Sequence, residues 1–233
     1  MSEVGNISID EARELVADRS LWPRVRDFLW DFAPQIHPSW LEDLDDLEHP
    51  DNPGHLDRQA FRELVGGLAS SARVKRFVLD SLGVEPCFHA FPGDDGSRLL
   101  LLDGATLESV ARWLGALAFV ETLRRVTSGA TVRALKAGLS GVYPEVFGYT
   151  MYFGKSVPPA DAEPQDLPAA VVGEGCALLL SALSGLPPSL VSRLKFKLPK
   201  GLCASAPRRE IRLSTVLKLL KLKFPEAHSL CCS

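Results

Sequence analysis

The 233-residue chain lacks the short motifs with which many enzymes bind phosphate, dinucleotides or metal. It contains no G-x-x-x-x-G-K-[ST], no G-x-G-x-x-G, no G-x-S-x-G and no H-E-x-x-H. Its five histidines are scattered and form no obvious pair with a nucleophile. We therefore predict no catalytic, cofactor-binding or metal-binding residues, and no enzymatic activity.

Cysteine is also scarce. The five cysteines are an odd number and include no C-x-x-C pair, which argues against a disulfide framework and against a zinc site. We expect reduced thiols, including Cys231 and Cys232, which no lipidation motif follows.

Long apolar runs are missing as well. The longest one in the middle of the chain covers residues 113–120, whereas a membrane-spanning helix needs about 17 to 25 residues. The first residues carry acids and no apolar stretch of the kind found in secretory signals. We expect no transmembrane segment and a cytosolic protein.

Charge, by contrast, is unevenly distributed. The formal net charge is only −3, but residues 1–60 hold 14 acids and 5 bases, and residues 190–233 hold 2 acids and 10 bases. Such a distribution suits either a contact between the two ends of one molecule or two different partners, and the sequence leaves both alternatives open.

Residues 99–126 are the central element that we predict. Their middle carries no polar side chain, which indicates a helix buried on all sides and covered by other helices. Asp103 or Thr106 can cap its start, Arg124 and Arg125 suit its negative end, and residues 128–129 supply a stop.

Helical spacing of apolar residues recurs along most of the chain, so we predict an all-α fold around the central helix. Residues 192–199 alternate basic and apolar side chains, which fits a strand or the end of a helix. A β-hairpin can form from residues 88–91 and 99–102. Other expected helices, some of them short or broken, fall within these ranges: 8–19, 20–33, 39–42, 57–82, 132–142, 144–152, 168–184 and 210–224.

Two segments interrupt this pattern. Residues 48–55 form a predicted loop, whose His49, Asp51 and His55 we interpret as solvated rather than as metal ligands. Residues 155–168 form a proline-rich linker and a possible lobe boundary.

We interpret Glu174, which lies between two glycines, as an edge or paired residue rather than a catalytic acid, and the glycines as sites of close helix approach. Residues 1–27 form a helical extension, and residues 28–233 form the main domain.

Basic residues form the candidate docking surfaces, and they gather in two places. Between residues 122 and 144 there are four bases and no acid, which fits a docking patch or an ordinary solvated face. Further bases surround the apolar stripe that Leu213, Leu217, Leu220 and Phe224 form in residues 210–224, a stripe that can close the helical core while the lysines face solvent. The alternative is a helical module whose basic C-terminal helix binds an anionic membrane or nucleic acid. The candidate docking residues are Arg124, Arg125, Arg133, Lys136, Arg212, Lys218 and Lys221.

The order of five segments resembles the YscK/SctK family of type III secretion proteins: IHPSWL, RWLGALAFVETLRRV, VVGEGCALLLSAL, SRLKFKLPK and STVLKLLKLKFPEAHSLCC. This resemblance runs from about residue 28 to the C-terminus. It implies a non-enzymatic cytosolic adaptor that links the cytoplasmic domain of the inner-membrane ring protein, SctD, to the pod protein, SctQ. It implies no nucleic-acid partner and carries over no single contact residue.

Overall fold

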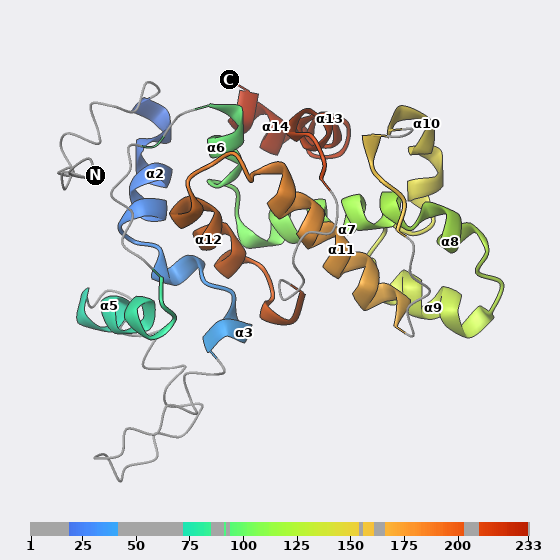
Figure 1. Ribbon diagram of the computed structural model, residues 1–233, viewed down its shortest axis with the longest axis horizontal. Helices are drawn as coiled ribbons and strands as arrows, with labels where there is room; N and C mark the ends of the chain where they lie inside the picture. Colours follow the sequence, from blue (N-terminus) through green and yellow to red (C-terminus); the bar gives the residue numbers. More distant parts are fainter. Residues whose placement is uncertain are drawn as a thin grey trace, which may run out of the picture. The chain divides into compact units, whose positions relative to one another are not determined.

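The computed structural model describes residues 19–41, 72–84, 91, 94–153, 156–160, 166–202 and 210–232. Within these ranges every regular element is a helix, and there is no strand (Figure 1). This confirms the predicted all-α class. The chain divides into two compact units, the first from residues 1–101 and 188–200 and the second from residues 102–187 and 201–233.

The second unit is built on two long helices that lie side by side, α7 (Gly104–Ala118) and α11 (Leu167–Ala182) (Figure 1). A Cβ atom added to Gly115 would lie 1.7 Å from the Val171 carbonyl oxygen, and one added to Gly175 would lie 1.7 Å from the Ala111 carbonyl oxygen. The two helix backbones are therefore in direct contact, where only the hydrogen atoms of glycine fit. The prediction that a glycine beside Glu174 admits another helix is confirmed for Gly175.

The central helix is shorter than the sequence predicts. Asp103 caps α7 as expected, because its carboxylate accepts a hydrogen bond from the Thr106 amide at 2.8 Å. The α-helix breaks at Phe119 and resumes as α8 (Val120–Arg124). Ser128 does not stop that helix but caps the next one, α9 (Gly129–Gly138).

The rest of the second unit surrounds this pair. The 3₁₀-helix η4 (Glu145–Gly148) and α10 (Thr150–Phe153) occupy the predicted range 144–152. The helix α13 (Leu213–Lys223) packs on α7 and on the last helix, α14 (Pro225–Cys232), which the sequence analysis did not predict. Cys231 is buried in α14, whereas Cys232 is exposed.

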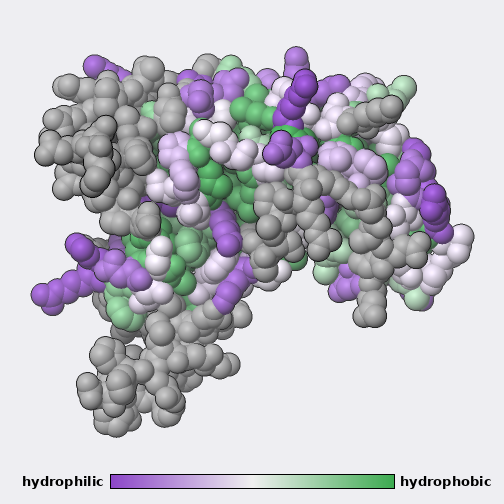
Figure 2. Space-filling view, viewed as in Figure 1, coloured by the Kyte–Doolittle hydropathy of each residue, from purple (hydrophilic) through white to green (hydrophobic). Residues whose placement is uncertain are grey.

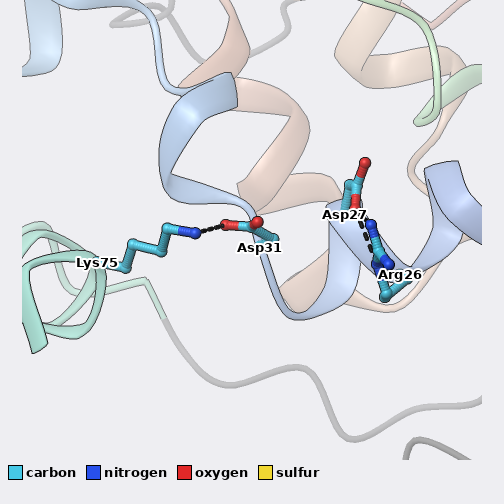
Figure 3. Close-up of polar contacts among 4 residues, drawn as sticks. All are labelled: Arg26, Asp27, Asp31 and Lys75. Atoms are coloured by element: carbon cyan, nitrogen blue, oxygen red, sulfur yellow. Dashed lines mark hydrogen bonds and ion pairs between the residues drawn. The ribbon is translucent and has the colours of Figure 1, made fainter. Parts of the chain in front are cut away.

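The first unit begins with η1 (Arg19–Leu21), α2 (Trp22–Leu29), η2 (Ala33–Gln35) and α3 (Pro38–Leu41). Val25, Phe28 and Leu29 form the buried stripe of α2, which lies in the predicted range 20–33, and Pro23 lies in its first turn. Helix α5 (Ala72–Ser81) is joined to the segment after α2 by an ion pair of 2.6 Å between Lys75 and Asp31 (Figure 3). Beside it, Arg26 and Asp27 pair within α2 itself.

Two elements of the first unit bear on the predicted strands. Residues 99–102 are not a strand, because Asp94 caps the short helix α6 (Asp95–Leu99), accepting a hydrogen bond from the Ser97 amide at 2.7 Å. The prediction of a hairpin strand there is wrong, and residues 88–90 lie outside the described residues. Of the two alternatives for residues 192–199, the helix holds through residue 197, as α12 (Pro188–Lys197).

The short 3₁₀-helix η6 (Lys200–Leu202) follows α12. Predicted features at residues 8–18, 42–71 and 161–165 lie outside the described residues. The range 155–168 falls within that of the second unit, and the division into residues 1–27 and 28–233 stays a prediction. None of the described helices is long and apolar enough to cross a bilayer.

The backbone contact between α7 and α11 predicts that even one added methyl group at Gly175 lowers the stability of the protein. Gly175→Ala should lower the free energy of unfolding by more than about 3 kcal/mol, because a methyl group cannot occupy the position of a backbone carbonyl. The measurement is urea unfolding followed by circular dichroism. Gly129→Ala is the matched control, since its Cβ would meet only the Arg133 side chain at 3.7 Å, and it should stay within about 0.5 kcal/mol of the parent. Equal stability of both variants would contradict the crossing.

Candidate interaction surface

The seven predicted docking residues are all exposed and all belong to the second unit. Arg124 ends α8, Arg125 follows it, and Arg133 and Lys136 lie on α9. Arg212 precedes α13, which carries Lys218 and Lys221. In Figure 2, hydrophilic atoms project from the molecule over the position of α13.

Two of these bases contact the short helix α10, one at its start and one near its end. The Arg124 guanidinium pairs with Glu121 at 2.7 Å and donates a hydrogen bond to the Thr150 hydroxyl at 3.2 Å, at the start of α10. The Lys218 ammonium donates a hydrogen bond to the Tyr152 carbonyl oxygen near the end of α10. Carbonyl groups at a helix end lack partners within the helix and carry partial negative charge, so they attract a cation.

Lys223, at the end of α13, has the most enclosed ammonium group of that helix's lysines. Its nitrogen lies 4.4 Å from the centre of the Trp113 ring and 4.2 Å from that of Tyr149, and it pairs with the Glu145 carboxylate. Only 13% of its side chain is exposed. Two ring faces and one carboxylate thus replace the water around this cation.

These partners also shift the pKa of Lys223. Burial by itself lowers the pKa of the ammonium, but hydrogen bonds to Glu145 and Tyr149, together with the charges on those groups, raise it by more. The net result is a pKa above the ordinary lysine value.

The register of α13 differs from the one predicted from its leucines. Its buried side chains include Val216, Leu219 and Leu220, and Lys223 continues this face, whereas Leu213 and Leu217 are only half-buried. The apolar stripe of Leu213, Leu217, Leu220 and Phe224 predicts that every lysine of α13 faces solvent. The spacing i, i+3, i+4, i+7 from Val216 to Lys223 is the signal in the sequence for the observed face, because a lysine stem is apolar enough to lie on a buried face.

The first unit contains two more bases that sequence reasoning did not single out. Arg193 and Lys197 on α12 are each 2% exposed. Arg193 donates a hydrogen bond to the Phe28 carbonyl oxygen at 2.9 Å, and Lys197 donates one to the Leu100 carbonyl oxygen at 2.6 Å. Their cations also lie over the rings of Phe32 and Phe28, respectively. These bases act inside the fold and are not available for docking.

The remaining residues discussed from the sequence are Glu174 and the possible metal ligands. Glu174 is half-buried in α11, and no group of three or more His, Cys, Asp or Glu side chains in the described ranges could hold a metal ion. The predicted loop with His49, Asp51 and His55 lies outside those ranges. What the described surface does present is exposed positive charge.

The enclosure of Lys223 predicts its contribution to stability. Lys223→Met should lower the free energy of unfolding by about 1 to 2 kcal/mol, because it keeps the apolar stem and removes the cation from two rings. Lys221→Met, two residues earlier and exposed, is the control and should change stability by less than about 0.5 kcal/mol. Tryptophan fluorescence in a urea titration measures both, and equal losses would count against the enclosure.

The raised pKa of Lys223 predicts a dependence on alkaline pH. A group whose pKa is higher in the folded state stabilises the fold fully below its unfolded pKa, about 10.4 for lysine, and this stabilisation is lost as the pH rises through the folded value. The stability difference between the parent and Lys223→Met should therefore be constant from about pH 7 to 9 and shrink above pH 10.5. Urea titrations across this range test it, and a difference that grows with pH would refute it.

Comparisons with known proteins give the chain its family. A family model described as YOP proteins translocation protein K (YscK) matches residues 34–232. Neither the curated proteins nor the solved structures contain a match. Since the matched range covers most of the chain, this protein belongs to the YscK family, the SctK family of type III secretion proteins.

Proposed function

We propose that the protein is a non-enzymatic adaptor in the sorting platform of a bacterial type III secretion system. In this role it links the cytoplasmic domain of the inner-membrane ring protein, which is SctD-like, to the SctQ-like pod protein. It would work at the cytoplasmic face of the inner membrane, attached there through protein contacts. The observation that carries the proposal is the family match over residues 34–232.

The distribution of charge supports two separate contacts. The first 60 residues carry a net charge of −9, and the seven exposed docking bases all belong to the second unit. Surfaces of opposite sign attract different partners and disfavour the wrong one. We assign the basic surface, which consists of these seven bases, to one partner and the acidic first 60 residues to the other.

The alternative is that the C-terminal helix binds an anionic membrane or nucleic acid. Two of the four bases around α13 are engaged within the unit, since Lys223 lies between two rings and Lys218 binds the Tyr152 carbonyl oxygen. Phosphate binding depends on cations that are free to replace counterions, and it falls steeply with salt. We therefore favour the adaptor, whose binding should depend less on salt.

Charge reversal on the basic surface tests the assignment. Replacing Arg124, Arg125, Arg133 and Lys136 with Glu should weaken binding to one partner at least tenfold and leave the other unchanged, because only one contact uses this surface. The measurement is co-purification, followed by calorimetric titration, with the ring protein's cytoplasmic domain and with the pod protein of the same organism.

The matched control reverses four exposed bases of the first unit: Arg19, Arg24, Arg73 and Arg76. It changes the net charge equally and should leave the affected partner's affinity within about twofold, while circular dichroism checks that both variants are folded. Unchanged binding of both partners by the α8–α9 variant would refute the assignment. Absence of binding by the parent protein at micromolar concentration would refute the adaptor role.

A further inference from the structure

Large apolar side chains are exposed at only a few places in the described residues. Four large apolar side chains are exposed in the described ranges, and three of them, Met151, Tyr152 and Leu222, belong to α10 and α13 in the second unit. Met151 is 81% exposed and Tyr152 is 49% exposed. An apolar cluster surrounded by polar residues is typical of a protein interaction site.

Helices α10 and α13 meet at Lys218. The Lys218 ammonium binds the Tyr152 carbonyl oxygen and lies 5.6 Å from the centre of the Phe153 ring. Leu222 lies one turn after Lys218 on α13, so the two share a face of that helix. We define the α10–α13 surface as Met151, Tyr152, Lys218, Lys221 and Leu222.

The charge around this surface is positive. Of the acids around it, Glu121 is paired with Arg124 and Glu145 with Lys223, and Glu226 is exposed at the start of α14, four residues after Leu222. Lys218 faces a neutral carbonyl group, and within the described part of the chain Lys221 forms no ion pair. An occupant that complements this surface carries carboxylates beside an apolar side chain.

We propose that the α10–α13 surface is the docking site for an acidic segment of a partner protein that inserts an apolar side chain beside Met151 and Tyr152. The partner's carboxylates would pair with Lys221 at the edge, while Lys218 stays bound to the Tyr152 carbonyl oxygen. An apolar centre with a charged rim is the usual anatomy of a protein–protein contact. A membrane is a poorer occupant, because Lys218 is held on α10. The proposal rests on the adaptor function above and specifies its basic contact.

The test uses the full chain, with the ring protein's cytoplasmic domain and the pod protein as probes. The double variant Met151→Asp/Tyr152→Ser should lower the affinity for one of them at least tenfold, and it should be the partner that the α8–α9 reversal also weakens. Lys221→Glu should lower the same affinity about threefold or more, mainly through slower association.

Matched controls lie on α5 of the first unit. Phe77→Ser removes an aromatic side chain that is 51% exposed, and Arg73→Glu reverses an exposed charge. Both should leave the two affinities within about twofold. Circular dichroism and urea unfolding confirm that every variant is folded.

The possible results separate the two proposals. If the parent protein binds neither probe, the adaptor function fails and this docking site fails with it. If the parent binds and the α10–α13 variants bind equally well, only the docking site is refuted. If Lys221→Glu instead abolishes binding to phosphatidylglycerol vesicles while protein binding is unchanged, the surface serves a membrane and the proposal is overturned.

Discussion

The direct backbone contact between α7 and α11 is the constraint on which the second unit depends. Gly115 and Gly175 each face a carbonyl oxygen of the opposite helix at a distance that excludes any side chain. Both helices bury most of their surface, so neighbouring helices such as α9 and α13 pack around a pair that cannot be moved apart without opening the core. Asp103 and Asp166 fix where the two helices begin.

Buried cations are the second recurring feature. Arg193 and Lys197 in the first unit and Lys223 in the second each place a charge over aromatic rings and against an oxygen atom. A cation removed from water needs such partners, since burial without them costs several kcal/mol. Part of the basic excess of the C-terminal region therefore serves packing, and the exposed remainder, such as Lys221, is what a partner can meet.

Two of the segments that carry the family resemblance are in contact, although about 160 positions separate them. The Trp40 indole donates a hydrogen bond to the Leu198 carbonyl oxygen at 2.8 Å, and its ring packs on Phe196 at 4.7 Å. The Ser39 hydroxyl accepts a hydrogen bond from the Lys200 amide at 2.9 Å.

The sequence by itself determined the all-α class, the presence of α7, α9, α11 and α13, and the family, because the helices follow from the period of apolar residues and the family from the order of the segments that they form. It left α12 open between a strand and a helix. Only the tertiary structure decided which charges lie inside. A hydrophobic pattern places charged residues such as Lys223 and Arg193 on the solvent-exposed side of a helix. Their aromatic partners, Trp113 and Phe32, lie far away in the sequence, so the pattern does not reveal them. The α10–α13 surface could not be predicted for the same reason, since its two helices are distant in sequence and meet where Lys218 contacts Tyr152 and Phe153.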